Sequence, residues 1–229
     1  MDDALLTLLK SVDTPTVCNA IEVAEGRRGF NRFTRGTMLA SAPGEVLVGY
    51  ARTAKIAAKV PSLAEAEKVR QMRMDYYRYM SEGPRPALCV VEDQDFPNAV
   101  GAFWGEINTN IHKAFGLSGT LTNGVMRDLG DLPEGYPVVA GSIGPSHAFV
   151  HVTDIDTPVT IHNLTVAPGE LVHADRHGAV VIPEPLISQM TAAIDKLMST
   201  ERIILDAAKS GMDFATFEAA WEEFERART

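Results

Sequence analysis

The sequence predicts a mixed α+β protein, with helices at both ends and strands concentrated in the middle. Two patterns indicate this class. Apolar residues recur at helical spacing near both ends of the chain. Between Pro137 and Pro183, short apolar runs alternate with Gly, Pro and Asp turns, which is typical of a strand-rich segment. The length of 229 residues is sufficient for a substantial core, so a single domain spanning residues 1–229 is expected.

The first half of the chain contains five expected elements. Leucines recur at helical spacing over residues 4–12, and Thr14-Pro15 caps a second helix with proline just inside it. Residues 46–56 form a strand-like run. A long helix with a polar face is expected from Pro61-Ser62 to about Met80. The short apolar run of residues 87–91, bounded by proline and acidic residues, indicates a buried strand.

The second half begins with a helix that ends near Phe115 and continues into an apolar strand over residues 117–122. Apolar spacing from Val100 to Ile111 would allow that helix to start before Gly105. Gly169-Glu170 and residues 175–178 are expected hairpin turns. Residues 184–229 predict two or three helices. The last of them carries one aromatic stripe, formed by Phe214, Phe217, Trp221 and Phe224.

Composition excludes several functional classes. The net charge of −9 argues against general nucleic-acid binding, because phosphate contacts need clustered Lys and Arg. No apolar run approaches the roughly 18 residues that span a bilayer, and the first residues lack a basic leader, so we expect a cytoplasmic protein without membrane contact. Cys18 and Cys89 lie in apolar runs without metal-ligand spacing, as small buried residues do.

The pattern most relevant to function joins Glu106 to Arg127-Asp128. A helix followed by a strand returns the chain to its starting point, so the two acids can meet. Together the three side chains supply two hard oxygen ligands and a fixed cation, which suits a divalent-metal enzyme acting on a small oxo acid. Two structural alternatives are open: a solvated helix carboxylate at Glu106, and a turn with an internal ion pair at Arg127-Asp128.

The segment from Trp104-Gly105-Glu106 to Asn123-Gly124-Val125-Met126-Arg127-Asp128, with Val166-Ala167-Pro168-Gly169-Glu170 and Asp175-Arg176-His177-Gly178, resembles the RraA-like family. That family includes class II pyruvate aldolases of the 4-hydroxy-4-methyl-2-oxoglutarate aldolase type. The resemblance covers about residues 14–183 and leaves residues 184–229 as a C-terminal helical extension. It implies an αββα sandwich related to swivelling β/β/α domains, assembled as a homotrimer or homohexamer.

The resemblance also implies a site and a reaction. Asp128 would bind Mg²⁺ or Mn²⁺ with Glu106, and Arg127 would contact the keto oxygen or carboxylate of the substrate. Gly105 and the amides of Ile107 and Asn108 would receive the substrate carboxylate at a helix N-terminus. Glu201 is the candidate for a further metal ligand from a neighbouring subunit, against an exposed helix glutamate.

The expected reaction is cleavage of a 4-hydroxy-2-oxo acid, of the 4-hydroxy-4-methyl-2-oxoglutarate or 4-carboxy-4-hydroxy-2-oxoadipate type, to pyruvate and a second keto acid. Oxaloacetate decarboxylation is the expected side activity. The alternative is a non-catalytic regulator that binds a ribonuclease, as the namesake proteins do. Those relatives lack the acid in the earlier loop, so Glu106 favours the enzyme. Five histidines in the strand-rich half form no helical pair, and His147 lies in a loop that could border the pocket.

Overall fold

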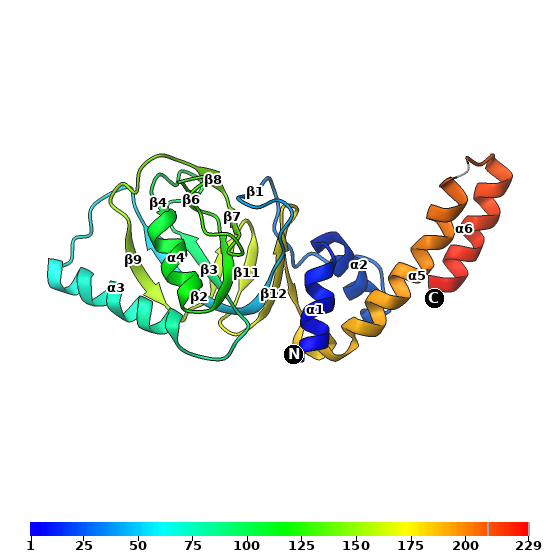
Figure 1. Cartoon of the computed structure of the whole chain (residues 1–229), viewed down its shortest axis with the longest axis horizontal. Helices are drawn as coiled ribbons and strands as arrows, with labels where there is room; N and C mark the ends of the chain where they lie inside the picture. Colours follow the sequence, from blue (N-terminus) through cyan, green and yellow to red (C-terminus); the bar gives the residue numbers. More distant parts are fainter. Residues whose placement is uncertain (210, 229) are drawn as a thin grey trace. The chain divides into compact units, whose positions relative to one another are not determined.

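An eight-stranded sheet forms the centre of this computed structural model, which describes residues 1–209 and 211–228. The chain divides into two compact units. One comprises residues 32–183 and contains the sheet, and the other comprises residues 1–31 with 184–229 and is helical. The predicted α+β class with helices at both ends is confirmed (Figure 1). The second unit resumes at Glu184, where the C-terminal helical extension was expected. The expectation of a single domain stays a prediction.

The main sheet is mixed, with a parallel centre. In spatial order its strands are β1 (Leu39–Ala40), β7 (Val138–Ala140), β5 (Leu117–Thr122), β3 (Ala87–Asp93), β2 (Leu47–Ala57), β12 (Leu171–Asp175) and β13 (Gly178–Ile182), with β9 (His151–Ile155) paired to the second half of β2. The strands β2, β3, β5 and β7 run parallel to one another. The central strand β3 is buried on both faces, which explains its continuous apolar run.

Different elements cover the two faces of this sheet. On one face the hairpin of β10 (Val159–Ile161) and β11 (Leu164–Val166) packs into an aliphatic core. On the other face lies α3 (Ala66–Ser81), which buries Tyr76 and Met80 against β3 (Figure 1). The prediction that this helix starts at Pro61-Ser62 was wrong. The Ser62 hydroxyl accepts a hydrogen bond from the Ala64 amide at 3.3 Å, and such a local bond competes with helix formation.

One of the two expected hairpin turns is present. Asp175 faces Gly178 across the tight connection between β12 and β13. The other prediction was wrong, because Gly169-Glu170 connects β11 to β12, and these two strands lie in different sheets. Local turn signals predict where the chain reverses, but the partner of each strand is decided by tertiary packing.

A small parallel sheet of β4 (Ala102–Trp104), β6 (Val125–Met126) and β8 (Ser142–Ile143) lies beside α4 (Glu106–Ala114). The alternative that α4 begins before Gly105 is therefore wrong. The backbone of residues 102–104 pairs with β6 instead, so the helix begins only after Gly105, its N-cap residue. The predicted end near Phe115 and the predicted strand over residues 117–122 are confirmed.

The helical unit contains α1 (Asp3–Ser11), α2 (Thr14–Glu25), the 3₁₀ helix η1 (Glu184–Gln189), α5 (Met190–Lys209) and α6 (Phe214–Arg228). The cap of α2 is Asp13 rather than Thr14, and its carboxylate accepts from the Thr16 amide at 2.9 Å. The predicted aromatic stripe lies along α6, which packs beside α5 (Figure 1). In the part of the chain that the structure describes, no helix is long and apolar enough to cross a membrane.

Candidate active site

The parallel pairing of β4 with β6 brings Glu106 and Arg127-Asp128 together. Trp104 is aligned with Met126, so the residues that follow each strand emerge at the same edge. The Arg127 amide donates to the Trp104 carbonyl at 2.9 Å, which extends the pairing by one residue. The prediction that a helix and a strand return the chain to its start is confirmed. The strand that does so is the two-residue β6, reached after β5.

Asp128 caps helix α4 from outside that helix. Its Oδ2 accepts a hydrogen bond from the Glu106 amide at 3.0 Å and lies 3.4 Å from Nε of Arg127. Gly105, at the N-cap position, has no side chain to do this, so a carboxylate from the neighbouring loop takes over. Asp128 adopts φ 56°, a left-handed conformation that aspartate tolerates better than most residues.

Gly105 is required by this close approach. A Cβ at this position would lie 2.7 Å from Nε of Arg127, and closer still to Oδ2 of Asp128. These distances are below van der Waals contact, so any side chain here would displace both functional groups. The glycine therefore has a role in the geometry of the site beyond its amide.

Arg127 is held with an unsatisfied donor. Its side chain is 31% exposed, while Nε is buried and has no hydrogen-bond partner among the described residues. A buried donor without an acceptor is costly in a finished protein core and common where a ligand binds. The alternative of an internal ion pair is present only as the long 3.4 Å contact to Asp128.

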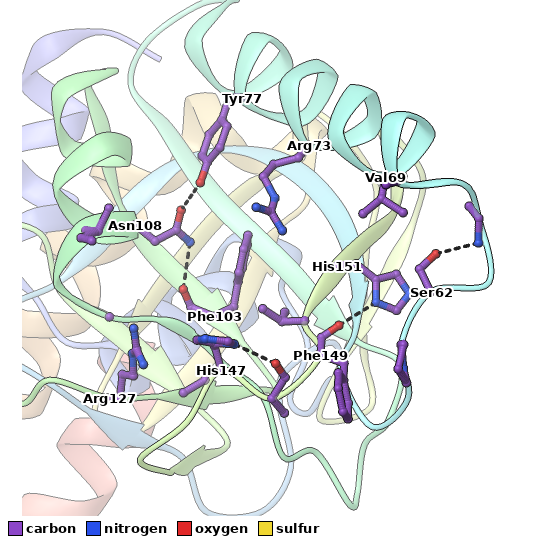
Figure 2. Close-up of a pocket in the computed structure, with 18 residues that line it drawn as sticks. Ser62, Val69, Arg73, Tyr77, Phe103, Asn108, Arg127, His147, Phe149 and His151 are labelled. Carbon is purple, nitrogen blue, oxygen red and sulfur yellow. Dashed lines mark hydrogen bonds between the residues drawn. The ribbon is translucent and has the colours of Figure 1, made fainter.

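The guanidinium of Arg127 lines a cleft of about 610 Å³ (Figure 2). Gly105, Ile107 and Asn108 line the same cleft. The amides of Ile107 and Asn108 belong to the first turn of α4, where backbone donors have no partner within the helix. The predicted substrate-binding residues Arg127, Gly105, Ile107 and Asn108 are thus brought together around one space, and an anion is the ligand this space suits.

Further groups in the cleft were not predicted. Arg73 and Tyr77 enter from α3, and His151 enters from β9. The expectation that His147 borders the pocket is confirmed. Nδ1 of His147 donates to the carbonyl of Ala148 at 2.7 Å. No Asp or Glu is among the described residues that line this cleft, although the chain carries a net charge of −9.

The candidate metal ligands are less fully assembled. Glu106 is exposed in the first turn of α4 and is not among the residues that line the cleft. Glu201 lies on α5, in the other unit, beside Arg28 and Trp221 in a small apolar pocket. Within residues 1–209 and 211–228 no group of three His, Cys, Asp or Glu side chains is arranged to hold a metal. The participation of Glu201 stays a prediction.

A buried polar chain fixes α4 beneath the site. Nδ1 of His112 donates to the Asn108 carbonyl at 2.6 Å, so its Nε2 accepts from the Tyr76 hydroxyl, also at 2.6 Å. Burial lowers the pKa of His112 to about 4, so the ring is neutral near pH 7. Trp104 packs edge-on against the same ring, with 5.1 Å between ring centroids. These contacts hold the first turn of α4 against α3.

The chain belongs to the RraA-like family, described as Aldolase/RraA, which matches residues 14–181. It is 25% identical over 151 residues to Protein DlpA of Legionella pneumophila. That alignment covers 64% of the chain and only 23% of the relative, so the chain spans less than a quarter of that protein's length.

Two solved structures share the fold. One is an uncharacterized protein from Pseudomonas syringae pv. tomato, with a TM-score of 0.69, 22% identity and coverage of 100% of this chain and 94% of that one. The other is RraAS2 of Streptomyces coelicolor, described as an unusual member of the RNase ES inhibitor RraA protein family. It has a TM-score of 0.65 and 23% identity, and the match covers 99% and 97% of the two chains. The family therefore includes both aldolase-type and ribonuclease-inhibitor members.

Proposed function

We propose that this protein is a divalent-metal-dependent lyase that cleaves a 4-hydroxy-2-oxo acid to pyruvate and a second oxo acid. The observation that carries the proposal is Arg127, whose Nε has no hydrogen-bond partner among the described residues and which lies beside the first-turn amides of α4. The described residues that line this cleft include no Asp or Glu. Substrates of the 4-hydroxy-4-methyl-2-oxoglutarate or 4-carboxy-4-hydroxy-2-oxoadipate type suit this cleft.

The reaction needs a stabilised oxyanion. Loss of the C4 hydroxyl proton turns C4 into a carbonyl, the C3–C4 bond breaks, and its electron pair moves into the enolate of pyruvate. Protonation at C3 then completes pyruvate. Arg127 stabilises the enolate oxygen with its positive charge and planar donors. The amides of Ile107 and Asn108 orient the C1 carboxylate. Oxaloacetate would lose CO₂ through the same enolate, which explains the expected decarboxylase activity.

The residues present fit a hard divalent cation such as Mg²⁺ or Mn²⁺. Oδ1 of Asp128 makes no hydrogen bond with the described residues, while Oδ2 accepts from the Glu106 amide. Mg²⁺ is usually bound by one or two carboxylates and several waters, which matches the pair of Asp128 and Glu106. When bound, the cation would supply positive charge that polarises the 2-oxo group. The side chain of Glu106 would complete or orient its ligand shell.

Assembly is part of the proposal. The aromatic stripe of α6 begins with Phe214, which is 72% exposed, and Leu205 on α5 is also exposed. A helical unit that leaves such side chains uncovered suits subunit contacts. We propose a homotrimer or homohexamer in which Glu201 of one subunit reaches the metal of another.

Pyruvate release tests this proposal. The protein would be stripped with EDTA and incubated with 4-hydroxy-4-methyl-2-oxoglutarate, 4-carboxy-4-hydroxy-2-oxoadipate or oxaloacetate, with and without added Mg²⁺ or Mn²⁺. We expect release that returns with the metal and that Arg127→Ala lowers by two or more orders of magnitude, since one oxyanion donor is worth roughly 3–4 kcal/mol. The absence of metal-dependent release from all three acids would refute the lyase.

The second candidate is a non-catalytic regulator that binds a ribonuclease. Its support is the similarity in fold to RraAS2 of Streptomyces coelicolor. Glu106 and the cationic cleft argue for the enzyme instead. Co-purification with a ribonuclease, combined with no pyruvate release, would favour the regulator.

A further inference from the structure

The cleft contains a second arginine in addition to Arg127. Arg73, on α3, lines it together with Arg127, and Figure 2 shows both guanidinium groups directed into the same space. Arg73 has no ion pair or hydrogen bond with any residue that the structure describes. Because the described residues that line the cleft include no Asp or Glu, none of them offsets the positive charge of Arg73.

The other arginines of α3 behave differently. Arg70 lies 3.6 Å from Glu67, and Arg78 lies 3.9 Å from Asp75, each pair one helical turn apart on the surface. The residue one turn before Arg73 is Arg70, which carries the same charge. Arg73 therefore faces the cleft and has no acidic residue three or four positions away on α3.

The surroundings of Arg73 favour an anion. The Tyr77 hydroxyl, one turn further along α3, donates to Oδ1 of Asn108 at 3.1 Å, which links α3 to the first turn of α4. Burial raises the pKa of Tyr77, and the nearby positive charge of Arg73 opposes part of that rise. Val69 and Phe103 supply apolar walls, next to which a charged hydrogen bond is stronger than in open water.

We propose that Arg73 binds a second carboxylate of the substrate, while Arg127 and the α4 amides bind the 2-oxo acid end. The inference rests on the proposed function and deepens it by naming the residue that recognises the far carboxylate of such a substrate; a monocarboxylic 2-oxo acid of equal length should bind poorly. Arg73 is then a specificity-determining residue, contributed by a helix that carries none of the residues around Asp128.

Binding measurements with two five-carbon ligands test this without requiring turnover. 2-Oxoglutarate has carboxylates at both ends, whereas 2-oxopentanoate has the same chain length and only one. Isothermal titration calorimetry in MgCl₂ should show 2-oxoglutarate binding about tenfold or more tightly to the wild type, as one charged hydrogen bond predicts. Arg73→Gln should reduce that ratio to near one by weakening 2-oxoglutarate alone. Arg73→Lys should keep part of it.

Arg70→Gln is the matched control, since it removes an arginine from the same helix that already has an acidic partner. It should keep the wild-type ratio, and circular dichroism should show all variants folded. A wild-type ratio in Arg73→Gln would overturn the inference, as would equal or absent binding of both ligands by the wild type. If the Arg73-dependent ratio is found but no 4-hydroxy acid releases pyruvate, the dicarboxylate site stands and the lyase fails.

Discussion

Substituting Gly105 by alanine should disable the site while the fold persists. The new Cβ would lie 2.7 Å from Nε of Arg127 and closer to Oδ2 of Asp128. Both atoms belong to side chains that can move, and they must withdraw by roughly 1 Å to reach ordinary contact. The hydrogen bond from the Glu106 amide to Oδ2, now 3.0 Å, would then be lost.

Two magnitudes follow from this displacement. Loss of a helix N-cap costs about 0.5–2 kcal/mol in the free energy of unfolding. A 1 Å misplacement of catalytic groups costs about 10²-fold in rate. We therefore expect Gly105→Ala to lower metal-dependent pyruvate release by about two orders of magnitude, with a modest loss of stability in urea denaturation.

Gly44→Ala is the control for this substitution. Nothing lies within 4 Å of a Cβ at Gly44, so activity and stability should stay near wild type, within about 0.5 kcal/mol. Wild-type turnover in a folded Gly105→Ala protein would refute the reasoning. It would mean that the positions of Arg127 and Asp128 do not govern catalysis.

Three further predictions concern neighbouring groups. Asp128→Asn should keep the cap on α4 and its stability but abolish metal-dependent activity, whereas Asp128→Ala should lose about 0.5–2 kcal/mol as well; equal activity in wild type and Asp128→Asn would exclude Asp128 as a metal ligand. Glu106→Gln should weaken Mn²⁺ binding in a calorimetric titration and leave stability unchanged, and an unchanged Mn²⁺ affinity would remove Glu106 from the metal site. Burial lowers the pKa of His112 from its ordinary 6.5 to about 4, so its contribution to stability is complete above about pH 6.5 and is lost as the pH falls toward 4. The free energy of unfolding of the wild type, measured relative to His112→Gln, should fall by about 3 kcal/mol over that range. The variant is needed as a reference because burial raises the pKa of Asp93 to about 6, and protonation of Asp93 in this range raises the stability as the pH falls. A difference that does not change with pH would show that His112 is not buried in its neutral form.

The approach of the chain at Glu106 to Arg127-Asp128 could be predicted from sequence because it depends on local order. A helix and a strand between two loops return the chain to one edge, and both elements have clear periodicity. The β4–β6 pairing that completes this return was not predictable. The strand β6 has only two residues, too few for a pattern. The spacing of Phe103, Trp104 and Ile107 also fits a helix, although residues 102–104 form a strand.

The second arginine of the cleft shows a different limit. The helical periodicity around Arg73 was recognised, but the face that meets the cleft depends on how α3 packs on the sheet through Tyr76 and Met80. The spacing of charged residues along α3 does distinguish Arg73 in the sequence. Arg70 and Arg78 each follow an acid by three residues, whereas Arg73 follows an arginine.

Exchange of the methyl protons of pyruvate tests the central claim most directly, because it needs enolate formation and no knowledge of the natural substrate. Pyruvate would be followed by ¹H NMR in D₂O with the wild-type protein and Mg²⁺ or Mn²⁺. We expect the methyl signal to decay with the metal, to persist after EDTA, and to persist with Arg127→Ala. A methyl signal that stays constant with the metal-loaded wild type would contradict the assignment of this cleft as a pyruvate-enolate site.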